Sequence, residues 1–280
     1  MIPIIQNVKR IPRRAAHQAR SRTLILGHRG ASREAPENTL AAFDLALQQG
    51  ADGIEFDVRF SADGVPMVIH DSRLERTTSG RGRVDALSAR ELRRLDAGAW
   101  FNERYPARAK ASFRGLKIPL LAEALAWVRE TRCLAYLEIK RERELNGGFE
   151  EKVLAAIREA RVPDRVVVIS FQPAMLERLR ELDDGIALGL DCTRPLLAVR
   201  RAQAAGAGVV LPLGALVTRR FVERAHAGGL QVAAWGVETP RASRRLLEIG
   251  VDALITNRPG ALRKLAESVR VAPDRARVVK

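Results

Sequence analysis

Short apolar runs alternate with amphipathic stretches about eight times along the chain from Thr23 onward. The runs have the length of buried β-strands, which we predict at residues 23–27, 53–58, 134–139, 166–170, 186–190, 208–212, 231–235 and 253–256. Between them, apolar residues recur with helical spacing, which predicts helices that include 39–49, 150–160, 173–182, 218–227 and 241–248. Glycines stand at helix ends or just before the next strand, where a left-handed cap is favoured: Gly50, Gly185, Gly206 and Gly250.

This alternation predicts an α/β protein whose single large domain, residues 23–268, is a (β/α)8 TIM barrel. A doubly wound open sheet is the competing fold. A nucleotide-binding sheet of that kind usually has a glycine-rich loop after its first strand, whereas this chain continues with His28-Arg29-Gly30. We therefore favour the barrel.

One interval breaks the rhythm, because 75 residues, 59–133, separate the second predicted strand from the third. A single loop and helix do not need so many residues. We predict a small inserted lobe over residues 72–117, followed by a helix that starts after Ile118-Pro119-Leu120. Active sites of barrels lie at the carboxyl ends of the strands, so the lobe is expected to cover the site.

The net charge of +15 suggests binding to a polyanion as one hypothesis. The charge is mostly arginine scattered over predicted helices, and aromatic residues are only 5% of the chain, which leaves few platforms for stacking bases. We expect a solvated basic surface and no specific nucleic-acid partner, with weak attraction to anionic membranes as the alternative. No run approaches the roughly 20 apolar residues of a membrane span.

Both ends of the chain differ from the barrel segment. Residues 1–22 contain six basic residues and no acidic one, and we interpret them as a basic arm rather than a secretory signal. Residues 269–280 form a basic tail. Cys133 and Cys192 lack metal-ligand spacing and favour a reducing compartment, so we expect a cytoplasmic protein; its oligomeric state stays open.

Carboxylates gather at the ends of the second and third predicted strands. Glu55 and Asp57 are two residues apart, so they share one face of a strand, about 6–7 Å apart. Glu138 and Lys140 repeat this spacing on the next strand. Buried carboxylates need compensation, and hard oxygen ligands suit Mg²⁺ or Ca²⁺ rather than zinc.

Two histidines flank these carboxylates, His28 after the first strand and His70 after the second. Together with Arg29 and Lys140 they fit a phosphate ester held by a divalent cation, with the imidazoles dividing the general-base and general-acid roles. Arg29 and Lys140 have an alternative role as ion-pair partners of the carboxylates. Trp235, at the end of the seventh predicted strand, contacts substrate or only packs in the core.

The ordered set of motifs resembles the glycerophosphodiester phosphodiesterases from about residue 23 to 265. It comprises His28-Arg29-Gly30, Pro36-Glu37-Asn38-Thr39, Glu55-Phe56-Asp57-Val58, His70-Asp71, Arg76-Thr77-Thr78-Ser79-Gly80, Leu137-Glu138-Ile139-Lys140, Trp235 and Arg258-Pro259. The resemblance implies that His28 and His70 are catalytic, that Glu55, Asp57 and Glu138 hold the cation, and that Arg29 and Lys140 contact phosphate.

Enzymes similar to this chain release an alcohol and glycerol 3-phosphate, and the resemblance implies that a neighbouring substrate hydroxyl attacks phosphorus to give a cyclic phosphate. The chain departs from the family pattern at Leu120, Glu238 and Gly260, none of them in the expected site. A lysophospholipase D or sphingomyelinase D-like activity is a second hypothesis. A non-catalytic binder of anionic head groups or polyanions is a third, and it predicts loss of a site residue, which the sequence does not show.

Overall fold

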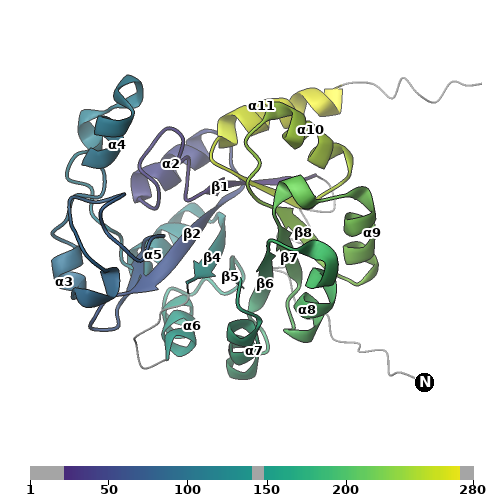
Figure 1. Cartoon of the computed structure of the whole chain (residues 1–280), viewed down its shortest axis with the longest axis horizontal. Helices are drawn as coiled ribbons and strands as arrows, with labels where there is room; N and C mark the ends of the chain where they lie inside the picture. The colour runs from purple at the N-terminus through teal and green to yellow at the C-terminus, as the bar shows by residue number, and fades with distance from the viewer. Residues whose placement is uncertain (1–21, 141–147, 272–280) are drawn as a thin grey trace, which may run out of the picture.

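The computed structural model describes residues 22–140 and 148–271, and these form the predicted TIM barrel (Figure 1). Eight parallel strands are bonded in the ring order β1-β2-β4-β5-β6-β7-β8-β9, and pairing of β1 with both β2 and β9 closes it. The ring strands are β1 (Leu24–His28), β2 (Gly53–Phe60), β4 (Leu134–Ile139), β5 (Val166–Ser170), β6 (Ala187–Cys192), β7 (Val209–Pro212), β8 (Gln231–Ala234) and β9 (Ala253–Thr256).

Helices between the strands form the outer layer of the barrel (Figure 1). They are α2 (Leu40–Gln48), α5 (Leu121–Thr131), α6 (Phe149–Glu159), α7 (Pro173–Leu182), α8 (Ala198–Ala204), α9 (Arg219–Ala227), α10 (Pro240–Glu248) and α11 (Pro259–Val271). The predicted helices agree with these bounds within a residue or so. Gly50, Gly206 and Gly250 have positive φ as expected, whereas Gly185 does not.

The hydrophobic residues form two layers around the barrel wall. Strand residues that point outward pack with the helices in the main core, which includes Phe43, Phe56 and Phe60. Inward-pointing residues such as Leu26, Tyr136 and Ile255 fill the barrel. Charged groups at the carboxyl ends of the strands therefore stand on a dry apolar floor, where unpaired charge is costly.

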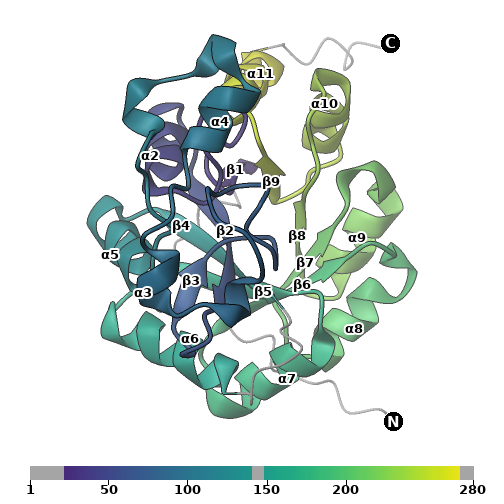
Figure 2. The ribbon, with the colours of Figure 1, turned by 60° about the vertical axis from the view of Figure 1, so that its left-hand side comes forward.

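The inserted segment between β2 and β4 packs as a lobe on the carboxyl end of β2 (Figure 2). β3 (Pro66–Val68) pairs antiparallel with the end of β2 outside the ring. The lobe continues through η1 (Val84–Ala86), α3 (Ala89–Leu92), α4 (Ala99–Arg104), η2 (Pro106–Arg108) and η3 (Ala111–Phe113). It has its own apolar clusters, one around Leu74 and Leu92 and another around Phe101 and Phe113.

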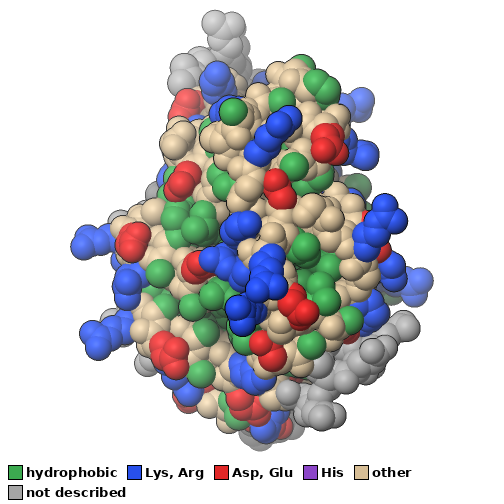
Figure 3. All heavy atoms as spheres, turned by 90° about the vertical axis from the view of Figure 1, so that its left-hand side faces the viewer, with side chains coloured by type: hydrophobic (Ala, Val, Ile, Leu, Met, Phe, Trp, Pro, Cys, Tyr) green, Lys and Arg blue, Asp and Glu red, His purple; other side chains and the backbone are tan. Residues whose placement is uncertain are grey.

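The face from which the lobe projects carries basic side chains near its centre, with acidic and hydrophobic side chains around them (Figure 3). None of the helices in the described ranges is long and apolar enough to cross a membrane. Most of the predicted basic arm lies outside those ranges, although Arg22 pairs with Asp52. Helix α11 continues past residue 268 to Val271, and the rest of the predicted tail is outside the described residues.

Candidate active site

Strand pairing brings the predicted polar residues to one end of the barrel. His28 is in register with Glu55 on the neighbouring strand, and Asp57 is in register with Glu138 on the next. A pocket of about 170 Å³ opens there, lined by His28, Arg29, Glu55, His70, Glu138, Lys140, Ile169, Phe171, Asp191, Trp235 and Ile255. Asp57 contacts Arg29 and Lys140 of this lining. All eight sequence-predicted site residues are therefore gathered here.

Three carboxylates form a compact, buried group in this pocket. Glu55, Asp57 and Glu138 are 3%, 1% and 7% exposed, and one oxygen from each lies within 4.8 Å of the others. Like charges so close in a dry site repel one another, so the group needs a cation or protons. Oxygen donors in this arrangement fit a hard divalent cation.

Two basic side chains pair with these carboxylates. The Nζ of Lys140 lies 2.9 Å from Oδ1 of Asp57 and 2.6 Å from Oε2 of Glu138. The Nε of Arg29 lies 3.1 Å from Oδ2 of Asp57, and its Nη1 lies 2.8 Å from Oε1 of Glu37. Both residues thus have the ion-pair role that the sequence left open as an alternative. Their positions on the pocket lining also leave them within reach of an anionic ligand.

The surroundings separate the pKa values of the three carboxyl groups. Burial and the negative charges of Asp57 and Glu138 raise the pKa of Glu55 well above its usual range. Burial, with the charge of Asp57, also raises the pKa of Glu138 to about 7, against the opposing ammonium of Lys140. Burial acts on Asp57 too, but Lys140 and Arg29 outweigh it and hold its pKa well below the usual range. Asp57 is the carboxylate that is ionised without a cation.

His28 has one ring nitrogen bonded and the other directed to the carboxylates. Its Nδ1 lies 2.8 Å from Oδ1 of Asn257, which accepts the Nδ1–H, and its Nε2 lies 3.8 Å from Oε2 of Glu55. Burial and the charge of Arg29 lower the pKa of His28 to about 4. A neutral imidazole with a free Nε2 can accept a proton at neutral pH.

His70 has a charged partner instead. Its Nδ1 donates to Oδ1 of Asp71 at 2.6 Å, and Asp71 also accepts from Nε of Arg76. Burial lowers the pKa of His70, and the hydrogen bond to Asp71 opposes that shift. A carboxylate that accepts a hydrogen bond from Nδ1 stabilises the imidazolium form, so His70 is more easily protonated than His28.

Three further polar residues complete the site, and sequence reasoning did not assign them a role. Asn38 donates from Nδ2 to Oδ2 of Asp57 at 2.8 Å, and Asn257 orients His28. Asp191 lines the pocket at 6% exposure, and no donor in the described part of the chain bonds to its Oδ2. Burial and the charge of Glu138 raise the pKa of Asp191 well above its usual range.

Trp235 packs in the core, one of the two roles that the sequence left open, while its contact with substrate stays a prediction. Its ring packs against the apolar filling of the barrel, and its Nε1 donates to the carbonyl of Leu211 at 2.9 Å. It also lines the pocket, where Phe171 meets it edge-on with ring centroids 6.0 Å apart. The two rings form an apolar wall opposite the charged groups.

Comparisons with known proteins agree with this geometry. The model of the glycerophosphoryl diester phosphodiesterase family matches residues 28–261. A glycerophosphodiester phosphodiesterase from Caldanaerobacter subterraneus subsp. tengcongensis is 34% identical over 245 residues, which cover 86% of this chain and 96% of the relative. One from Bacillus subtilis is 31% identical over 258 residues, covering 87% and 86%.

Solved structures show the same similarity. A glycerophosphodiester phosphodiesterase from Agrobacterium tumefaciens has a TM-score of 0.75 and 33% identity, covering 86% of this chain and 99% of that one. An Oleispira antarctica phosphodiesterase, solved in complex with the product sn-glycerol-3-phosphate, has a TM-score of 0.77 and 28% identity, covering 89% and 99%. On the family match and these relatives, the chain belongs to the glycerophosphoryl diester phosphodiesterase family.

Proposed function

We propose that this protein hydrolyses small glycerophosphodiesters to an alcohol and sn-glycerol 3-phosphate, with His28 and His70 transferring the protons. The observation that carries the proposal is the meeting of two imidazoles, three buried carboxylates, Arg29 and Lys140 in one small pocket. The named activity of the relatives and the product bound to the Oleispira protein support it. The non-catalytic alternative predicted loss of a site residue, and none is lost.

A divalent cation, Mg²⁺ or Ca²⁺, fits the carboxylate group of Glu55, Asp57 and Glu138, whose oxygens converge within 4.8 Å. When bound, it would neutralise the phosphate and the negative charge that develops during reaction. Arg29 and Lys140 border the same space and would contact phosphate oxygens while keeping their pairs with Asp57.

The two histidines differ in their partners, and we base the proposed roles on this difference. His28 rests on the neutral amide of Asn257 and has a pKa of about 4, so its free Nε2 is the general base. Burial lowers the pKa of His70, but the carboxylate of Asp71 opposes this shift by stabilising the protonated ring, which supports the general-acid role for His70. Asn257 and Asp71 act as positioning residues for the two rings.

The first step is attack of the substrate's own hydroxyl, on the carbon next to the ester-bearing one, at phosphorus. His28 takes the hydroxyl proton as the new O–P bond forms. The bond from phosphorus to the departing alcohol breaks, and His70 gives that oxygen a proton. Water then opens the cyclic phosphate with the two histidines in reversed roles. Proximity of the hydroxyl replaces a protein nucleophile.

The pocket favours small head groups. Its volume of about 170 Å³ is below the range of pockets that bind drug-sized ligands, about 300–1,000 Å³. The wall formed by Trp235 and Phe171 suits the carbon atoms of glycerol or of a choline or ethanolamine group. A long acyl chain has no room inside this pocket. We therefore favour hydrolysis of small glycerophosphodiesters over a lysophospholipase D activity.

The test is release of glycerol 3-phosphate from glycerophosphocholine and glycerophosphoethanolamine, with Mg²⁺, Ca²⁺ or chelator. We expect cation-dependent release that falls about 10²- to 10⁴-fold in His28→Ala. The matched control is His226→Ala, which removes an imidazole that bonds Asp252 away from the pocket. No release from either substrate with any cation, by a folded sample, would overturn the proposal, and so would equal loss in both variants.

A further inference from the structure

The described residues include four large hydrophobic side chains that are exposed, and all lie on one side of the catalytic end of the barrel. Phe171 follows β5, Leu196 and Leu197 follow β6, and Leu216 follows β7. We call these four residues the apolar rim. Leu196 is 76% exposed, so its side chain contributes little to the stability of the fold. The inserted lobe follows β2 and leaves this side of the barrel end open (Figure 2).

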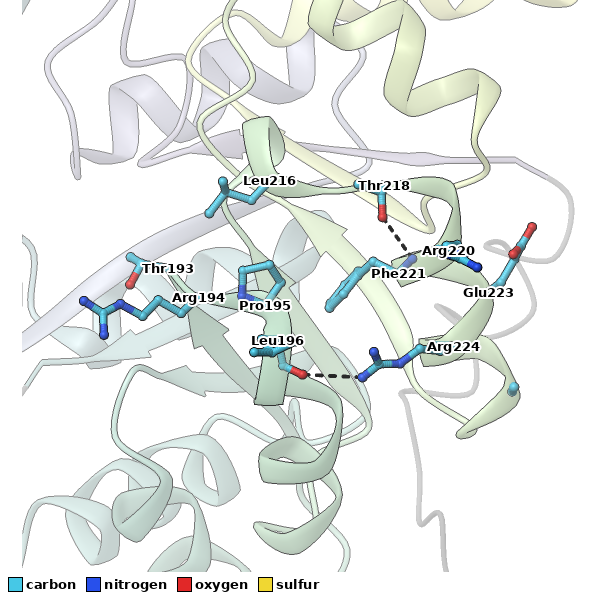
Figure 4. Close-up of a pocket in the computed structure, with 11 residues that line it drawn as sticks. Thr193, Arg194, Pro195, Leu196, Leu216, Thr218, Arg220, Phe221, Glu223 and Arg224 are labelled. Carbon is cyan, nitrogen blue, oxygen red and sulfur yellow. Dashed lines mark hydrogen bonds between the residues drawn. The ribbon is translucent and has the colours of Figure 1, made fainter.

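An apolar groove of about 1070 Å³ adjoins the rim (Figure 4). The loop after β6 forms one side with Pro195 and Leu196, and α9 forms the other with Phe221 and Arg224. The Nη2 of Arg224 spans the groove toward the carbonyl of Leu196 at 3.5 Å. An exposed apolar patch that is surrounded by polar residues is typical of an interaction site.

Three arginines line the groove: Arg194, Arg220 and Arg224. No carboxylate pairs with them among the described residues, as is also true of other exposed arginines such as Arg129. What distinguishes these three arginines is their position beside the exposed leucines. Glu223 is the single acidic residue in the groove lining. Unpaired basic groups beside exposed leucines form a surface complementary to anionic groups that lie over an apolar layer.

Helix α9 contributes exposed basic groups near the groove. Its first turn contains Arg219 and Arg220 and no acidic residue. A helix N-terminus favours negative charge, so these arginines cost helix stability rather than add to it. Both side chains are exposed. Their charge is therefore available to an external anionic partner.

We infer that the apolar rim and its arginines dock this protein onto an anionic phospholipid bilayer. The leucines enter the boundary between head groups and acyl chains, and Arg194, Arg220 and Arg224 contact lipid phosphates. A nucleic acid would use the arginines but not the exposed leucines. Because Phe171 belongs both to the rim and to the pocket, docking places the opening of the active site next to the lipid surface.

The test is co-sedimentation of the full chain with vesicles of phosphatidylglycerol and phosphatidylcholine, and with pure phosphatidylcholine vesicles, at about 0.1 M salt. We expect binding to the anionic vesicles that weakens as salt rises. Leu196→Ser with Leu197→Ser should weaken it at least about tenfold. Arg220→Glu should weaken it at least about fivefold. The matched control is Arg129→Glu, an exposed arginine near the end of α5, away from the catalytic end.

Thermal unfolding serves as the fold control, and Arg220→Glu should not unfold at a lower temperature than the wild type, because it improves the first turn of α9. Absence of wild-type binding to anionic vesicles would overturn the inference. So would equal losses in Arg220→Glu and Arg129→Glu, or a loss confined to the charge variants, which would show non-specific adsorption. The assay needs no catalysis, so its outcome is separate from that of the proposed hydrolysis.

Discussion

Cation binding to the carboxylate group should stabilise the fold by an amount that grows with pH. The proposed ligands Glu55 and Glu138 both have a raised pKa, that of Glu138 about 7, so protons should compete with the cation. Without a cation, the folded protein holds these protons more tightly than the unfolded chain does. Its stability therefore falls as pH rises from about 4.5 to about 7. A bound cation reverses that loss.

The expected size of this stabilisation follows from the cation concentration relative to its dissociation constant. A cation at a hundred times its dissociation constant adds about 2.7 kcal/mol to the free energy of unfolding. For a chain of this size that is about 5 °C in melting temperature. At pH 6, a ligand with a pKa of about 7 is mostly protonated, and the cation binds about tenfold more weakly. This costs about 1.4 kcal/mol, so the shift should halve.

The assay is thermal unfolding of the chelator-treated protein at pH 6 and pH 8, with and without Ca²⁺ or Mg²⁺. Glu138→Gln keeps the shape of the side chain and should reduce the shift to about 1 °C or less. Glu130→Gln is the matched control, because Glu130 is exposed on α5. The reasoning is refuted if Glu138→Gln keeps the full shift, or if the shift is larger at pH 6 than at pH 8.

Two further substitutions test the site and its scaffold. Asp191→Asn removes a buried carboxyl whose pKa is raised by burial and by Glu138. In urea unfolding, the variant should therefore gain stability relative to the wild type as pH rises above the usual range of an aspartate; a constant difference contradicts this. Gly30→Ala places a Cβ 2.5 Å from the backbone of Ala42 at a φ of +83° and should cost about 2–4 kcal/mol. Gly82→Ala, with φ of +95° and nothing within 4 Å, is its control and should lose only the strain of the backbone; equal losses would exclude the steric explanation.

The barrel and the carboxylate group were predictable because both follow from short-range periodicity. Alternation along β2 puts Glu55 and Asp57 on one face, and the length of the apolar runs places Glu138 at the same end of the next strand. Thr39 and Thr218 cap their helices where the spacing predicted helix starts. These features depend on neighbours within a few residues, which the sequence displays directly.

The residues that orient the site depend on contacts between distant segments. Asn257 reaches His28 from the far end of the chain, and Asn38 reaches Asp57 from the loop before α2. No local sequence pattern predicts such pairs of distant residues. Asp191 is different, because β6 continues past the predicted end at residue 190. Every second residue of β6, namely Ala187, Gly189 and Asp191, faces the barrel interior. A prediction with a longer strand here would therefore have placed the Asp191 carboxyl in the pocket.

The charges at the top of the barrel explain why the site is suited to a divalent cation. Four carboxyl groups, Glu55, Asp57, Glu138 and Asp191, face two permanent cations, Arg29 and Lys140, and four minus two leaves two negative charges. The apolar filling beneath them offers no compensation. Without a cation the deficit is met by protons, as the raised pKa values of Glu55 and Asp191 indicate. One divalent cation supplies the same two charges, so binding should release protons, and the pH-dependent thermal shift measures that exchange.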